Sequence, residues 1–330
     1  MSREDLRKRY ARVFRSLGRA ELQSGALELS ELDPSVLLEP MTELWMGFYT
    51  EEGLHVGLER YGLFDEIRRL GYEEFSVKTG TEDADEHLLR IHSILPKISE
   101  PLIELVSRRS YLNLSGELGE QLAGSSPHIL SIEWLLLQNP LGEFEATRPP
   151  LPGQHHRGSG IAENIFELLR NVCLRIGLAG LATVPSYFHN ALLYSQNFSY
   201  MDPRYEGRFD ALANALEEAI VKQSDLPRHV HLAAKSWAVQ ERLLMDANAC
   251  GGDKGDKEAR RFEWFFEPML SPITPKLQDY LASEWYEQER FEAEQACDFI
   301  IELPLILELL EERGIHPFDP GKLTTWLDHD

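Results

Sequence analysis

The chain has 330 residues, of which 43% are hydrophobic and 27% are charged, as in a folded globular protein rather than a disordered one. Acidic residues outnumber basic ones by 55 to 33, and the net charge of −22 repels nucleic-acid phosphates and anionic lipid. The sequence has no run of about 18 apolar residues that could span a membrane, and its three cysteines have no metal-type or disulfide-type spacing. We therefore expect a cytoplasmic protein that binds neither nucleic acid nor membrane.

The N-terminal segment, residues 1–71, has a helical pattern. Leu6, Tyr10 and Leu17 recur at helical spacing within a basic stretch, which predicts an amphipathic first helix. A second helical pattern ends at Gly71, a residue suited to terminate a helix. We assign these residues to one helical segment.

The next part of the chain changes to short β-prone runs separated by glycine, proline and acidic turns. We predict four strands in chain order, at residues 72–80, 87–94, 101–114 and 128–140. The fourth run is almost continuously apolar, which predicts a strand buried on both faces and ended by Pro140.

A loop rich in proline and glycine, residues 145–160, follows the fourth strand. We predict a helix over 161–177, because one apolar stripe runs along it and Gly177 closes it. A short strand at 178–185 and a short helix at 188–196 come next. The central region, residues 72–203, therefore combines strands and helices in one core.

The C-terminal region, residues 204–330, reads as almost wholly helical. Between Asp279 and Glu312 it contains 11 acidic residues and a single basic one, Arg290. A run of this kind is a solvated helix face in most proteins. Its alternative role is an acidic surface that binds a partner.

The end of the long loop is equipped for an anionic ligand. Arg157, Gly158, Ser159 and Gly160 lie between a predicted strand and the start of a predicted helix. Backbone amides at such a place are accessible, the helix dipole is positive there, and Arg157 adds donors suited to phosphate. A plain glycine turn before a capped helix remains the alternative.

The order of strand, glycine loop, amphipathic helix, strand and short helix resembles the GNAT superfamily of acyl-CoA-dependent N-acetyltransferases. The resemblance is carried by SIEWLLLQ, HHRGSG, IAENIFELLRNVCLRIG, GLATVP and YFHNALLYSQNF. It implies an α+β fold with a GNAT-like mixed sheet flanked by helices, to which the C-terminal helices are an extension. It also implies acetyl-CoA or another acyl-CoA as donor and an amine as acceptor, and the acidic surface favours a cationic amine.

The resemblance assigns roles to individual residues. The amides of Gly158, Ser159 and Gly160 would hold the diphosphate of coenzyme A beside Arg157. The strand from Glu133 to Leu137, with Leu135 and Leu137 as contacts, would pair with the pantetheine arm, which Asn190 would approach. Tyr194 would protonate the departing thiolate.

Acyl transfer also needs a base for the attacking ammonium group. Glu133 lies between Ile132 and Trp134, where desolvation would raise its pKa. A salt bridge is the alternative for this carboxylate, and packing in the core is the alternative for Tyr194.

Two other functions remain open. The first is a non-catalytic scaffold with the GNAT-like core, in which the acidic helices bind a partner. The second is a metal-dependent enzyme whose ligands are imidazoles and carboxylates. The candidates for that metal site are His155, His156, His189, Asp202 and Glu206.

Overall fold

A computed structural model describes residues 3–24, 44–81, 85–95, 98–112, 116–122, 124, 126–248 and 259–315. These residues form two compact units. The first consists of the described residues within 1–119, 123–142 and 156–182, and the second consists of those within 120–122, 143–155 and 183–330. The chain is a mixture of helices and strands, in which a mostly antiparallel open sheet is flanked by helices. In the described residues we find no helix with the length and apolar character needed to cross a bilayer.

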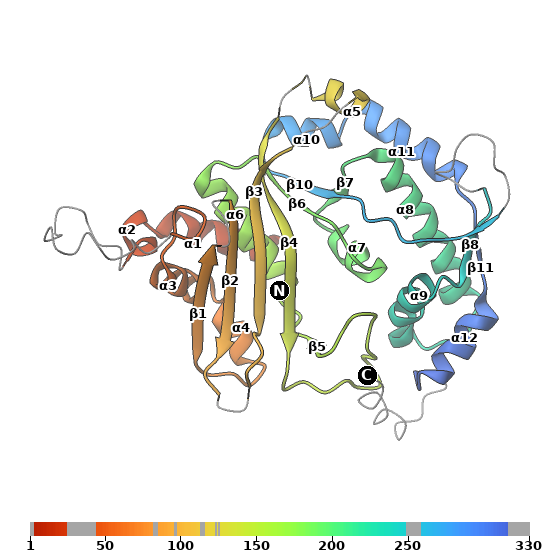
Figure 1. Cartoon of the computed structure of the whole chain (residues 1–330), viewed down its shortest axis with the longest axis horizontal. Coiled ribbons are helices and arrows are strands. Elements are labelled where there is room, and N and C mark those ends of the chain that lie inside the picture. Colours follow the sequence, from red (N-terminus) through yellow and green to blue (C-terminus); the bar gives the residue numbers. More distant parts are fainter. Residues whose placement is uncertain are drawn as a thin grey trace, which may run out of the picture. The chain divides into compact units, whose positions relative to one another are not determined.

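Four consecutive strands form the antiparallel sheet of the first unit (Figure 1). They are β1 (Phe75–Thr81), β2 (Glu86–Ser93), β3 (Ile103–Tyr111) and β4 (His128–Asn139), each within three residues of its predicted position. Buried residues face one another across the ladder: Val77 lies opposite Ile91, and Leu89 lies opposite Leu105. Two shorter strands, β5 (Arg157–Gly158) and β6 (Gly180–Thr183), adjoin β4, and the last residue of β6 belongs to the second unit.

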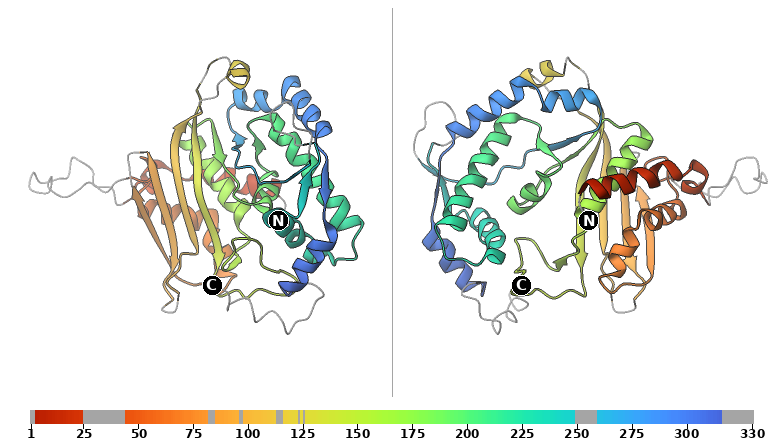
Figure 2. Two further views of the ribbon diagram at one scale, coloured as in Figure 1. Left: turned by 45° about the vertical axis from the view of Figure 1, so that its right-hand side comes forward. Right: turned by 180° about the vertical axis from the view of Figure 1, so that it is seen from behind.

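Helices cover one face of this sheet, and Figure 2 shows α1 lying across α6 on that face. The helices up to β6 are α1 (Arg3–Ser16), α2 (Arg19–Leu22), α3 (Glu51–Tyr61), α4 (Leu63–Arg68), α5 (Gly116–Gln121) and α6 (Ala162–Ile176). The Asn164 amide donates to the Tyr10 hydroxyl at 3.0 Å, and Arg175 donates to the carbonyls of Phe14 and Leu17. The predicted first helix and the helix ending at Gly177 are both confirmed; Gly177 has a φ of 75°.

The expectation that β4 is buried on both faces is wrong. Trp134 is 52% exposed, and Glu133 beside it is also exposed. Within the first unit the helices cover only one face of the sheet, so alternate residues of β4 do not enter that core.

The second unit has helices separated by very short strands. Its helices are α7 (Phe188–Tyr194), α8 (Pro203–Leu216), which continues as the π-helix η2 (Glu217–Lys222), the 3₁₀ helix η3 (Arg228–Val230), α9 (His231–Gln240), α10 (Pro275–Leu281), α11 (Glu284–Ala296) and α12 (Leu303–Glu312). Its strands are β7 (Ser199–Tyr200), β8 (Leu244–Asp246), β9 (Arg260–Arg261), β10 (Met269–Pro272) and β11 (Phe299–Ile301). β10 pairs with β7, and β8 pairs with both β11 and β9, all antiparallel.

The expectation of an almost wholly helical C-terminal region is therefore only partly correct. The long helical pattern near residue 280 is interrupted, because the Ser283 hydroxyl accepts from the Tyr286 amide and starts α11 anew. Cys297 then adopts an extended conformation, and β11 follows it. Strands of two to four residues are too short to produce a recognisable alternation in the sequence.

Candidate ligand-binding site at the glycine loop

The second edge of β4 is only partly covered by other strands. β4 has twelve residues, whereas β6 has four and β5 has two. The Ala179 amide donates to the His128 carbonyl at the start of β4, and β5 pairs with Gln138 and Asn139 at its end. β6 follows Ala179 beside β4, so β5 and β6 together can pair with at most half of the residues of β4, and the described strands leave the rest of this edge without a partner.

Glu133 lies on β4 at a β-bulge. Val106 of β3 faces Trp134 and Ser107 faces Ile132, so Glu133 is an additional residue on β4. A bulge bends a strand and redirects a side chain, and bulges are common beside functional sites. The side chain of Glu133 is exposed and accepts from Arg108 Nε at 2.9 Å. The desolvated environment that we expected for this carboxylate is absent, and the salt bridge is what the structure contains.

The glycine loop lies beside the C-terminal end of β4. Arg157 and Gly158 pair with Asn139 and Gln138, and the Ser159 amide donates to the Leu137 carbonyl at 3.3 Å. The Ser159 amide is therefore engaged by the strand. Its Oγ, in contrast, is shielded from solvent and has no hydrogen-bond partner among the described residues.

The backbone of the loop turns at Gly160 before it enters α6. Its φ of 75° lies in the left-handed region, which L side chains rarely adopt. A Cβ atom built on Gly160 meets no atom within 4 Å, so the space beside the loop is open. The unpartnered strand edge and this open space lie at the same end of β4.

The N-terminus of α6 has no side-chain cap. Its N-cap residue is Ile161, which has no side-chain oxygen to accept from the first amides. The acidic residue of the first turn, Glu163, is paired with Arg3 at 3.1 Å, which offsets its charge at the helix end. The helix therefore presents uncapped amides and a partial positive charge, to which an anion can bind.

The remaining predicted residues are divided between the two units. Leu135 and Leu137 lie on β4 in the first unit, both half-buried, opposite Leu105 and Ile103 of β3. Asn190 and Tyr194 lie on α7 in the second unit, and burial raises the pKa of Tyr194 to about 12. The phenol is therefore protonated at neutral pH, as a proton donor must be.

The candidate metal ligands have other environments. The Asp202 carboxylate accepts from the Arg204 amide at 2.9 Å and caps α8, and Glu206 accepts from the Tyr200 amide at 2.5 Å. His189 is buried against Tyr187, and burial lowers its pKa to about 4. In the part of the chain that the structure describes, no three such side chains are arranged to hold a metal ion.

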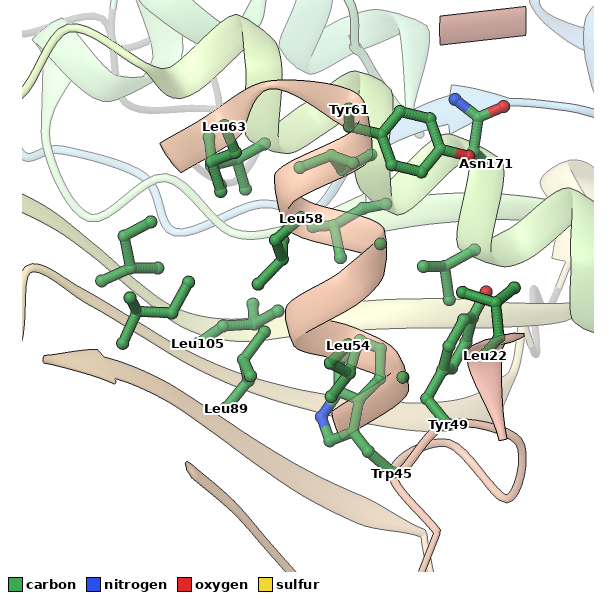
Figure 3. A pocket seen from close by; sticks show the side chains of 18 of the residues that line it. Leu22, Trp45, Tyr49, Leu54, Leu58, Tyr61, Leu63, Leu89, Leu105 and Asn171 are labelled. Atoms are coloured by element: carbon green, nitrogen blue, oxygen red, sulfur yellow. The ribbon is translucent and has the colours of Figure 1, made fainter. Parts of the chain in front are cut away.

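The first unit also contains an apolar cavity lined by α3, α6 and the sheet (Figure 3), which no motif in the sequence predicts. Its lining includes Trp45 and Gly57. The two glycines of α3, Gly53 and Gly57, are a local signal in the sequence, because glycine inside a helix costs about 1 kcal/mol relative to alanine.

We compared the chain with protein families, curated proteins and solved structures, and found no match in any of the three.

Proposed function

We propose that the first unit binds an acyl-CoA and that the protein is a GNAT-like N-acyltransferase that transfers the acyl group to an amine. The observation that carries the proposal is the part of the β4 edge that β5 and β6 are too short to cover, together with the adjoining glycine loop and the uncapped start of α6. A free strand edge suits an amide-bearing chain, and an uncapped helix start suits a diphosphate. In coenzyme A, the amide-bearing pantetheine chain is attached directly to a diphosphate.

The pantetheine arm would add to the sheet beside β4. Its amides would bond with those backbone groups between Glu133 and Leu137 that β5 and β6 leave unpaired, as peptides do when they extend an exposed sheet edge. Leu135 and Leu137 would flank it. The carbonyl of Leu137 is already used by the Ser159 amide, so the arm would end before this residue.

The diphosphate would lie at the loop. Gly160 leaves open space there, and the first amides of α6 are uncapped. The Ser159 hydroxyl is shielded from solvent and has no partner among the described residues, and it would rotate toward the ligand to donate to a phosphate oxygen. Arg157 would supply the positive charge.

One residue of the first unit would move a proton of the reaction. Glu133 would take a proton from the ammonium group of the acceptor, so that the free amine can attack the thioester carbonyl. The carbon–sulfur bond then breaks, and the second proton lost by the attacking nitrogen passes to the thiolate. The products are an amide and free coenzyme A. A cytoplasmic location would suit this donor.

Titration calorimetry with coenzyme A tests the proposal. We expect binding by the native chain and affinity weakened about 10-fold by Ser159→Ala, because a hydrogen bond to a charged group is lost. Ser16→Ala on α1 is the control, because it removes an exposed hydroxyl that is distant in sequence from the glycine loop. It should leave the affinity for coenzyme A unchanged. If the folded chain does not bind coenzyme A at millimolar concentration, the proposal is wrong, and the acidic-scaffold alternative gains support.

A further inference from the structure

Helices α8 and α11 of the second unit are in backbone contact, and Figures 1 and 2 show them side by side. A Cβ atom built on Gly207 of α8 would lie 2.0 Å from the Arg290 carbonyl oxygen and 2.8 Å from the Glu294 amide nitrogen of α11. No side chain larger than hydrogen fits between the two backbones there. A change of charge beside Gly207 therefore acts directly on the spacing of the two helices.

Glu206, the residue before Gly207, is buried next to this contact. It is 7% exposed, and its carboxylate accepts from the Tyr200 amide of β7 at 2.5 Å. Among the described residues, it forms no ion pair with a lysine, arginine or histidine. A buried carboxylate without a counter-ion favours its neutral form, and burial raises the pKa of Glu206 to about 7.

Arg290 of α11 is the cation near Glu206, and two other carboxylates already bind it. Its Nε donates to Asp210, one turn after Glu206 on α8, at 2.7 Å, and its Nη1 lies 3.7 Å from Glu287. These two carboxylates and one guanidinium have a net charge of −1, which ionisation of Glu206 changes to −2. Repulsion from Asp210 and Glu287 adds to the cost of burying the charge, and attraction to Arg290 offsets only part of it.

The other titratable groups that face Glu206 are phenols. Burial raises the pKa of Tyr200 on β7 and of Tyr286 on α11, so both side chains stay neutral around pH 7. The Tyr286 hydroxyl donates at 2.6 Å to the carbonyl of Tyr200, the residue whose amide donates to Glu206. Tyr200 therefore links α8 to α11, and Glu206 is the member of this described cluster whose charge changes near neutral pH.

We propose that the contact between α8 and α11 is a pH-sensitive switch, which is closed while Glu206 is protonated and opens locally when Glu206 ionises. An ionised carboxylate at this position must reach water, either by moving outward or by admitting water between the helices. Both changes loosen the backbone contact at Gly207 and the link through Tyr200. The inference is independent of the proposed function, because it concerns residues of the second unit alone.

The direction of the response follows from the pKa of Glu206. This pKa is about 7 in the closed state, whereas the ordinary value of 4.5 applies when the side chain is in water. Opening is therefore rarest below pH 4.5, increases as pH rises, and levels off above pH 7. With these two pKa values, the open fraction increases about 70-fold between pH 5 and pH 8.

Hydrogen exchange of the full chain from pH 5 to pH 8, corrected for the intrinsic pH dependence of amide exchange, measures this opening. We expect the corrected rate to increase about 70-fold in residues 199–207 and 286–294 and to level off above pH 7. Helix α9 of the same unit is the reference and should keep a constant corrected rate. A flat profile in both segments would overturn the inference. The same increase in α9 would also overturn it, because the whole unit would then be unfolding.

Two glutamate-to-glutamine variants identify the responsible group. Glu206→Gln keeps an acceptor for the Tyr200 amide but carries no charge, so its corrected exchange should not depend on pH. Glu292→Gln makes the same change at an exposed position of α11 and should retain the native response. A pH response that persists in a folded Glu206→Gln chain would assign the opening to another group and contradict the inference.

The native profile decides the matter if Glu206→Gln does not fold. An increase that levels off near pH 7 in the two segments, with α9 constant, agrees with the switch. An increase that continues unchanged to pH 8 contradicts it, because Glu206 is then fully ionised and has no further effect.

Discussion

Two buried residues of the second unit respond to pH in opposite directions. Burial raises the pKa of Glu206 from 4.5 to about 7, whereas it lowers the pKa of His189 from 6.5 to about 4. The stability that depends on neutral Glu206 is present below pH 4.5 and is lost as pH rises through 7. The stability that depends on neutral His189 is present above pH 6.5 and is lost as pH falls through 4.

We predict that Glu206→Gln is progressively more stable than the native chain as pH rises from 5 to 8, by an amount on the order of 3 kcal/mol. Glutamine keeps an oxygen that can accept from the Tyr200 amide but carries no charge. His189→Asn should show its gain on the acidic side instead, between pH 6 and pH 4. Urea unfolding across this range measures both, and parallel profiles for native and variant chains would contradict the pKa shifts.

At the scale of elements, α3 offers a pair of glycines with different constraints. We predict that Gly57→Ala raises the free energy of unfolding by about 1 kcal/mol, because alanine is the better helix former and the site has room. Gly53→Ala should lower it, because the new methyl group collides with the Leu22 backbone, where α2 approaches α3. Denaturant unfolding of both variants decides the matter; a destabilised Gly57→Ala would show that the cavity does not have this space.

Elements with a strong local pattern could be predicted from the sequence. Apolar residues follow a strand-like or helix-like pattern over many positions of β1 to β4 and α6. Gly177 ends α6 at the position that the sequence predicts. The two-residue strands of the second unit have no such pattern, because their partners are distant in sequence. Propensity and periodicity carry no information on such pairings.

The parts of the candidate site that depend on neighbouring residues could be predicted in the same way. The glycine loop directly precedes a helical pattern, so the sequence places it at the start of a helix. The bulge at Glu133 arises from the register of β4 with β3, and no pattern within residues 132–137 predicts it. The cavity is lined by Trp45, Gly57 and α6, which are far apart in the sequence and come together only through tertiary packing.

At the scale of the whole molecule, charge makes a prediction about the acceptor. The net charge is −22, so a cationic amine is attracted over long range and this attraction is screened by salt. We predict that KM for a cationic acceptor rises between 0.05 and 0.5 M salt, while KM for a neutral amine of similar size changes little. The same salt response for both acceptors would show that the field of the protein plays no part.

Hydrogen exchange with and without coenzyme A tests the central claim most directly, because it reports on individual backbone amides. We predict that coenzyme A slows exchange in two segments of the first unit, residues 133–137 on β4 and residues 158–164 at the loop and the start of α6, and leaves the amides of β1 unchanged. Bound coenzyme A that protects neither segment would contradict the account.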